Sequence, residues 1–99
     1  MLEQLTSASL GAQLNTKFRL SPEPEKIVEL ELVEVKDSND VEGQTERFSA
    51  FFRGPLESFL PQRTYSMEHE AMGSFELFIV PLRQDAAGFY YEAVFNRLR

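Results

Sequence analysis

The segment from Ile27 to Lys36 constrains the fold of this chain more than any other stretch. Over Val28–Leu32, apolar residues alternate with glutamates, as in a strand with one buried face and one solvated face. The apolar positions then move to Val33 and Val35, so the alternation changes parity within the strand. We interpret this change as a bulge or sharp bend near Leu32-Val33. Because such bends curl a sheet toward a barrel, the segment predicts a strongly curved sheet.

Five further segments have the length and composition of strands. They are Phe18–Leu20, Arg47–Arg53, Thr64–His69, Ser74–Arg83 and Phe89–Asn96. In the fourth of them the centre, Leu77–Val80, is apolar on both faces, so we expect burial on both sides there. Two prolines within residues 21–24 are expected to end the first strand, and residues 37–40 with Gly43 supply a further turn. A single helical turn is expected over residues 56–60.

The N-terminal residues 1–14 predict a short helix. Four leucines roughly follow helical spacing there, and Gly11 weakens or ends the pattern. Thr6-Ser7 could instead cap a shorter helix that begins near Ala8. We therefore expect one mainly β domain of the α+β type over residues 1–99. Its sheet is expected to be an antiparallel meander of five to six strands, strongly curved or a small open barrel, with the helix over one side or end.

The charge balance limits the classes of partner. Ten basic and sixteen acidic residues give a net charge of -6, whereas a nucleic-acid binder needs a cationic surface. We therefore expect neither a nucleic acid nor an anionic membrane as partner. The chain has no cysteine, which excludes a disulfide framework and a thiolate metal site. With no signal-peptide pattern and no apolar run near the roughly 18 residues of a membrane span, a cytoplasmic location is expected.

The only histidine, His69, lies between two glutamates where a strand is expected to meet a turn. A zinc-protease pattern needs a second histidine four residues later on a helix, and position 73 is glycine. In a strand, Glu68 and Glu70 point away from His69, so the three side chains do not converge. We interpret His69 as a structural or turn-stabilising residue, and we expect no metal and no cofactor.

The chain has no recognisable pattern for a catalytic nucleophile or a phosphate-binding loop. It contains neither a Gly-x-Ser-x-Gly elbow nor a Ser-x-x-Lys motif, and its five glycines are spread singly over turns. Glu29 and Glu31 share one face of a strand, which we interpret as a solvated face rather than an acid–base pair. The sequence therefore predicts that the protein is not an enzyme.

Four residues are candidates for a binding role: Arg53, Tyr65, His69 and Tyr90. Arg53 follows two phenylalanines and precedes Gly54-Pro55, in a connection that two prolines make rigid. Its guanidinium could clamp a carboxylate of a partner or satisfy local groups, and we favour the local role. The Tyr90-Tyr91 pair places one ring on each face of the last strand. One is expected in the core and the other at the surface, as an interface anchor.

Several short motifs give the chain a resemblance to a known family. They are Phe52-Arg53-Gly54-Pro55, Leu60-Pro61-Gln62-x-x-Tyr65, His69, Gly73, Leu77-Phe78-Ile79-Val80-Pro81 and Tyr91-Glu92-Ala93-Val94-Phe95-Asn96. In these motifs, which span its second half, the chain resembles an uncharacterised bacterial domain family of similar length. The resemblance implies no activity, and an association of such domains with phage-tail-like proteins implies a structural or accessory role. The chain departs from the family pattern at Arg63, where a small residue such as glycine is expected.

Three functions follow as hypotheses. The first, which we take as the prediction, is a non-enzymatic structural or protein-interaction module with a protein partner or a second copy of itself. The alternative is a small-ligand-binding β domain that uses the interior or mouth of the curved sheet. The third is an enzyme that uses His69 with Arg53, Glu68 or Tyr65.

Overall fold

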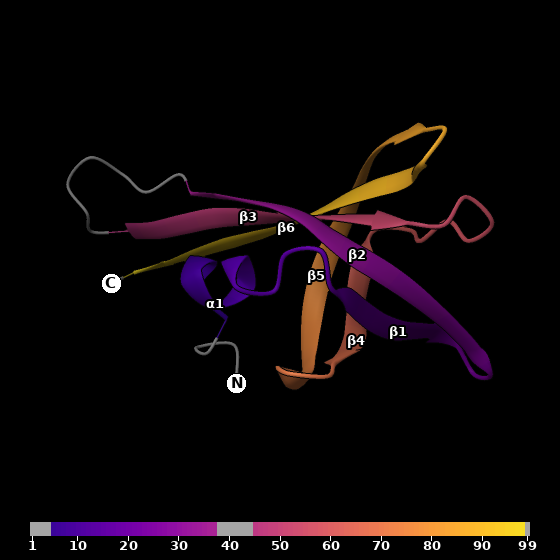
Figure 1. The fold of residues 1–99 in the computed structure, drawn as a ribbon, viewed down its shortest axis with the longest axis horizontal. Coiled ribbons are helices and arrows are strands. Elements are labelled where there is room, and N and C mark those ends of the chain that lie inside the picture. Colours follow the sequence, from indigo (N-terminus) through magenta and orange to yellow (C-terminus); the bar gives the residue numbers. More distant parts are fainter. Residues whose placement is uncertain (1–4, 38–44, 99) are drawn as a thin grey trace.

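A computed structural model describes residues 5–37 and 45–98 as one short helix and six antiparallel strands (Figure 1). The elements are α1 (Ser7–Gly11), β1 (Lys17–Glu23), β2 (Lys26–Asp37), β3 (Thr45–Gly54), β4 (Arg63–His69), β5 (Gly73–Asp85) and β6 (Gly88–Leu98). This confirms the predicted mainly antiparallel β fold with an N-terminal helix. The start of the predicted helix and the predicted turn at residues 38–43 lie outside the described residues.

The strands close into a ring in the order β1-β2-β3-β6-β5-β4, and β4 pairs with β1. The order departs from a simple meander at one step, because β3 pairs with β6 rather than with β4. The chain forms two three-stranded meanders joined by the connection of residues 55–62, and β4 returns to lie beside β1, as in a Greek key. A connection of this length with two prolines cannot form a tight hairpin, so β4 pairs elsewhere.

The predicted bulge lies where the parity of β2 changes. Leu32 pairs with Phe52 and Glu34 pairs with Phe51, so Val33 is the extra residue opposite β3. Because of this extra residue, the apolar side chains after the bulge face the core again, and Val35 packs against it. The prediction of a bulge near Leu32-Val33 is therefore confirmed.

The inner face of the ring is filled by an apolar core with an aromatic centre. Phe18 of β1 packs edge-on against Phe52 of β3, with ring centroids 5.3 Å apart. Phe48 and Phe95 stack across β3 and β6 at 4.4 Å. The prediction that Leu77–Val80 is buried on both faces is wrong, because the Phe78 side chain is 48% exposed. Each strand of a ring has one inner face, so Leu77 and Ile79 are buried and Phe78 points outward.

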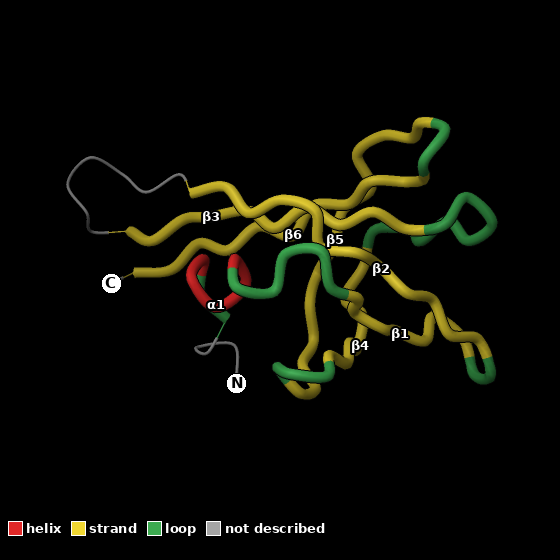
Figure 2. The backbone as a smooth tube through the Cα atoms, viewed as in Figure 1, coloured by secondary structure: helices red, strands yellow, loops and turns green. Residues whose placement is uncertain are grey.

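The helix is shorter than the predicted 1–14 and begins where the alternative placed it, after Thr6. The Thr6 Oγ1 atom accepts a hydrogen bond from the Ser9 N–H at 3.0 Å, and the Ser9 Oγ atom accepts one from the Thr6 N–H at 2.9 Å. This capping box satisfies two backbone donors that a helix start leaves unpaired. Leu10 is fully buried. The helix α1 contacts β2 and β3, and Figure 2 shows it beside the sheet.

Replacement of Thr6 by alanine is expected to lower the free energy of unfolding by about 1 kcal/mol, because it removes the capping acceptor. Ser7→Ala, one residue later, is the matched control, since no capping bond uses the Ser7 side chain. Urea denaturation of the two variants checks the difference. Equal stability of the two variants would show that the capping box contributes nothing.

Two local predictions need correction. The first strand is longer than the predicted Phe18–Leu20, because β1 runs through Pro22 and ends at Glu23, just before Pro24. The chain then turns at Glu25, whose φ is 71°. Pro22 lies beyond the residues at which β1 pairs with β4, so its missing N–H costs no ladder bond in that pairing. Residues 56–60 form no helical turn; the Ser58 N–H donates to the Pro55 carbonyl at 3.3 Å, which makes a simple turn.

Candidate functional site

The four candidate residues do not meet in one site. Arg53 and Tyr90 are cross-strand partners on β3 and β6, and neither is in the buried core. Tyr65 and His69 lie on the inner face of β4, four residues apart, and both are buried. The prediction that one ring of the tyrosine pair lies in the core and the other at the surface is confirmed, because Tyr91 is fully buried and Tyr90 is partly exposed. The role of Tyr90 as an interface anchor stays a prediction. The Arg83 guanidinium lies 3.9 Å from the centre of the Tyr90 ring.

His69 holds the turn between β4 and β5. Its Nδ1 atom accepts hydrogen bonds from the backbone N–H groups of Ala71 at 3.0 Å and Met72 at 3.2 Å. Its Nε2 atom lies 2.8 Å from the Oγ1 atom of Thr16. Burial lowers the pKa of His69 below its usual value, more than the neighbouring Glu70 raises it. The structural interpretation of His69 therefore agrees with its contacts.

Two buried tyrosines fasten the connection of residues 55–62 to the ring. The Tyr91 hydroxyl accepts a hydrogen bond from the buried Leu60 N–H at 3.0 Å. The Tyr65 hydroxyl donates to the Pro61 carbonyl at 2.6 Å. Burial raises the pKa of both phenols, so both stay protonated at neutral pH. Arg63 begins β4, and its guanidinium carbon lies 4.7 Å from the centre of the Tyr65 ring.

Gly54 closes β3 at a point where no side chain fits. A Cβ atom there would lie 2.6 Å from the Cδ2 atom of Leu30 and 3.3 Å from the Tyr91 ring. Because Gly54 has no Cβ atom, β3 can end against Leu30 and the Tyr91 ring without displacing either side chain. The Gly-Pro pair therefore serves the fold, and it places Pro55 on the outer surface beside β2.

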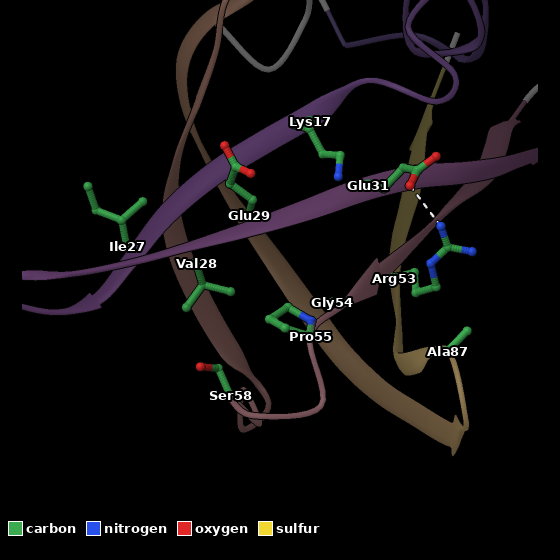
Figure 3. Close-up of a pocket in the computed structure, with 10 residues that line it drawn as sticks. All are labelled: Lys17, Ile27, Val28, Glu29, Glu31, Arg53, Gly54, Pro55, Ser58 and Ala87. Atoms are coloured by element: carbon green, nitrogen blue, oxygen red, sulfur yellow. Dashed lines mark hydrogen bonds and ion pairs between the residues drawn. The ribbon is translucent and has the colours of Figure 1, made fainter.

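An open groove of about 520 Å³ lies on the outside of the ring, between β1, β2, the end of β3 and the 55–58 turn (Figure 3). Its lining residues are Lys17, Ile27, Val28, Glu29, Glu31, Arg53, Gly54, Pro55, Ser58 and Ala87. Three of the charged side chains stand in one row across the strands, because Lys17 pairs with Glu31 and Glu31 pairs with Arg53. Of the four sequence candidates, only Arg53 lines this groove.

Arg53 is engaged within its own chain. Its Nη2 atom donates to the Oε1 atom of Glu31 at 2.7 Å, the one ion pair drawn in Figure 3. A hydrogen bond with Tyr90, and then the charge of Glu31, raise the pKa of Arg53 above its usual value. This agrees with the local role that we favoured for Arg53. Its side chain is still 35% exposed, so part of the guanidinium fork remains accessible from the groove.

Lys17 and Glu29, unlike Arg53 and Glu31, are not engaged in an ion pair within the described chain. Their side chains line the same groove, and neither forms an ion pair or hydrogen bond with any residue in the described part of the chain. Sequence reasoning missed Lys17 and treated Glu29 as part of a solvated face. The alternation placed Glu29 and Glu31 on one face correctly. Only the register of β1 and β3 against β2 shows that cations flank them.

Within ranges 5–37 and 45–98, no group of three histidine or acidic side chains is placed to hold a metal ion. No described helix has the length and apolar character that crossing a membrane requires.

Comparison with known proteins gives one match. Residues 5–95 match a family described as a domain of unknown function, DUF6916. Neither the curated proteins nor the solved structures provide a match to the chain. The family match covers nearly the whole chain, from Leu5, the residue before the helix cap, to Phe95, a buried residue of β6. The chain therefore belongs to the DUF6916 family of domains of unknown function.

Proposed function

We propose that this domain is a non-enzymatic protein-interaction module whose docking site is the groove between β1, β2 and the 55–58 turn. The observation that supports it most is the pair Lys17 and Glu29, two opposite charges without a partner in the described chain. Unpaired charges of known position on a concave surface select a partner with complementary charges.

The positions of the two charges define what a partner must present. Arg19 pairs with Glu29 across the ladder, and Lys17 pairs with Glu31, so Lys17 and Glu29 are diagonal neighbours. Such neighbours lie about 7–8 Å apart. On an extended segment, side chains two residues apart project from one side with a spacing of about 7 Å. We therefore infer a partner segment in which an acidic residue lies two positions from a basic one.

Ile27 adds an apolar contact at the end of the groove. It lies two residues before Glu29 on the outer face of β2, and its side chain is 69% exposed. Pro55 provides a second apolar surface among the lining residues (Figure 3). An exposed aliphatic side chain beside arginine and paired charges has the composition of a small interface centre.

The contacts of the candidate acid–base groups support a role without catalysis. Both ring nitrogens of His69 are used in the fold, and the hydroxyls of Tyr65 and Tyr91 hold the 55–62 connection. A general acid or base needs a proton that the substrate can reach. Self-association, and an accessory part in a phage-tail-like assembly, are narrower forms of the same proposal.

The test is capture of partners from a native lysate on the immobilised domain, with quantification by mass spectrometry. We expect one defined protein whose capture falls at least about tenfold with Glu29→Lys, which is about 1.4 kcal/mol of binding free energy. Ile27→Asp should have a similar effect, because it places a charge at the apolar contact. Glu34→Lys is the matched control: it lies on the same strand with the same change of charge, outside the groove.

Capture that survives Glu29→Lys and Ile27→Asp would contradict the groove as the docking site. Loss of capture with Glu34→Lys as well would indicate a general charge effect instead. A domain that stays monomeric and captures no defined protein would contradict the module itself.

The volume of the groove also favours the second candidate, a small-ligand site, since ligand pockets span about 300–1,000 Å³. Native mass spectrometry of the untagged protein separates the two. Additional mass of stoichiometric amount, lost in Arg53→Ala, would favour the ligand. A bare protein would favour the interaction module.

A further inference from the structure

The ring is closed by one short ladder. β1 and β4 pair only at Arg19 with Glu68 and at Leu20 with Met67, whereas β3 pairs with β6 at every residue from Thr45 to Gly54. Beyond Leu20, β1 bends at an irregularity, and a cavity of about 200 Å³ lies beside it, lined in part by Ser21 and Ser66. The β1–β4 closure is therefore the part of the ring with the fewest backbone bonds among the described strands.

Side chains fasten the closure at its two ends. At one end, Nη2 of Arg63 donates to the Pro22 carbonyl at 2.9 Å. At the other end His69, the last residue of β4, reaches Thr16 just before β1 and packs against Phe18, with ring centroids 4.3 Å apart. His69 thus joins the β4–β5 turn to the residues that lead into β1.

The hydrogen positions at His69 follow from its neighbours. Two N–H donors point at Nδ1, so Nδ1 carries no proton. The Thr16 hydroxyl donates its hydrogen to the Gln13 carbonyl at 2.6 Å, so its oxygen accepts from Nε2–H. The neutral Nε2–H form satisfies every group in this network. A proton added to Nδ1 would face two N–H donors, and the turn could not keep its bonds.

We propose that neutral His69 keeps the ring closed. Protonation of its Nδ1 atom breaks the hydrogen bonds of the turn of residues 70–72 and opens the β1–β4 pairing. The β2, β3 and β6 strands stay paired in this open state, because their ladders are longer and do not involve His69.

The charges that face His69 come from two elements. Glu70 in the turn favours the protonated ring, and Arg19 on β1 disfavours it. Glu68 lies opposite Arg19, with Arg19 Nη2 4.0 Å from its Oε1 atom, and offsets part of that charge. Burial has the largest effect and lowers the pKa of His69 in the closed ring. In the open state water reaches the ring, so the pKa of His69 returns toward the usual histidine value of about 6.5 and this state binds more protons. The closed state is therefore favoured above that pH, and its stability relative to the open state decreases as the pH falls below it.

Amide hydrogen exchange of the wild-type domain, measured by NMR between pH 7.5 and pH 5 and corrected for intrinsic rates, tests the proposal. We expect the amides of Ala71 and Met72, and the amide that β1 donates to β4 at Arg19-Leu20, to lose protection by up to about tenfold per pH unit below 6.5. Amides in the β3–β6 ladder should keep their protection over the same range. In the variant His69→Asn, whose Oδ1 atom can still accept from the turn but does not titrate, the pH dependence should disappear.

A second measurement needs no variant. Nitrogen-15 shifts of the imidazole should report the Nε2–H form at pH 7.5 and protonation of Nδ1 at the pH where turn protection falls. An Nδ1–H form at pH 7.5 would overturn the proposal. So would turn amides that stay protected at pH 5, or loss of protection that is equal in the β3–β6 ladder.

Discussion

Tyr91→Ala is expected to lower the free energy of unfolding by about 4–5 kcal/mol, the largest effect of any single change proposed for this domain. The side chain is fully buried in β6, and its ring packs at the point where Gly54 leaves no room for a side chain. The hydroxyl also accepts the Leu60 N–H bond at 3.0 Å, so its loss leaves a buried donor unpaired. A loss of this size is a large part of the stability of a small domain.

Two conservative variants separate the contribution of the Tyr91 ring from that of its hydroxyl group. Tyr91→Phe keeps the ring and should cost about 1–2 kcal/mol for the unpaired Leu60 donor. Tyr90→Phe, at the neighbouring and partly exposed position, should cost less than about 0.5 kcal/mol. Urea denaturation followed by circular dichroism gives the three values. Equal stability of Tyr91→Phe and the wild type would show that the connection of residues 55–62 does not depend on this bond.

Gly88→Ala is expected to cost about 3–4 kcal/mol, from two causes that add. Its φ of 155° lies in a region that side chains rarely adopt, and a Cβ atom there would fall on the carbonyl oxygen of Gly54. That oxygen belongs to the backbone, so relief requires the end of β3 and the start of β6 to separate. Asp85 Oδ1 accepts the Ala87 and Gly88 N–H bonds at 2.8 and 3.2 Å, which further limits movement of this turn.

Gly73→Ala is the matched control for this prediction. Gly73 also has a positive φ, 81°, but a Cβ atom there would meet nothing within 4 Å. It should therefore cost only about 1–2 kcal/mol, for the backbone conformation alone. Thermal unfolding of both variants provides the comparison. Equal losses of stability in the two variants would mean that the close approach of Gly88 to Gly54 does not contribute to the effect of Gly88→Ala.

The sequence determined the features that depend on neighbouring residues. The parity change after Leu32 predicted the bulge at Val33, because alternation has a period of two and one extra residue must restore it. Thr6 supported the alternative of a shorter, capped helix, which the structure has, because its side chain competes locally for backbone donors. Tyr90-Tyr91 predicted one inner and one outer ring, since adjacent strand residues face opposite sides. The structural interpretation of His69 also came from local geometry.

The tertiary structure decided what depends on which strands become neighbours. Nothing near β3 in the sequence shows that it pairs with β6, or that β4 closes the ring against β1. For the same reason Phe78, apolar by sequence, lies outside a ring whose strands have a single inner face. The groove arises in the same way, because Lys17 and Arg53 flank Glu31 only through the registers of two separate strand pairs. Local pattern sets the face of each side chain, whereas register and closure come from the free energy of packing the whole core.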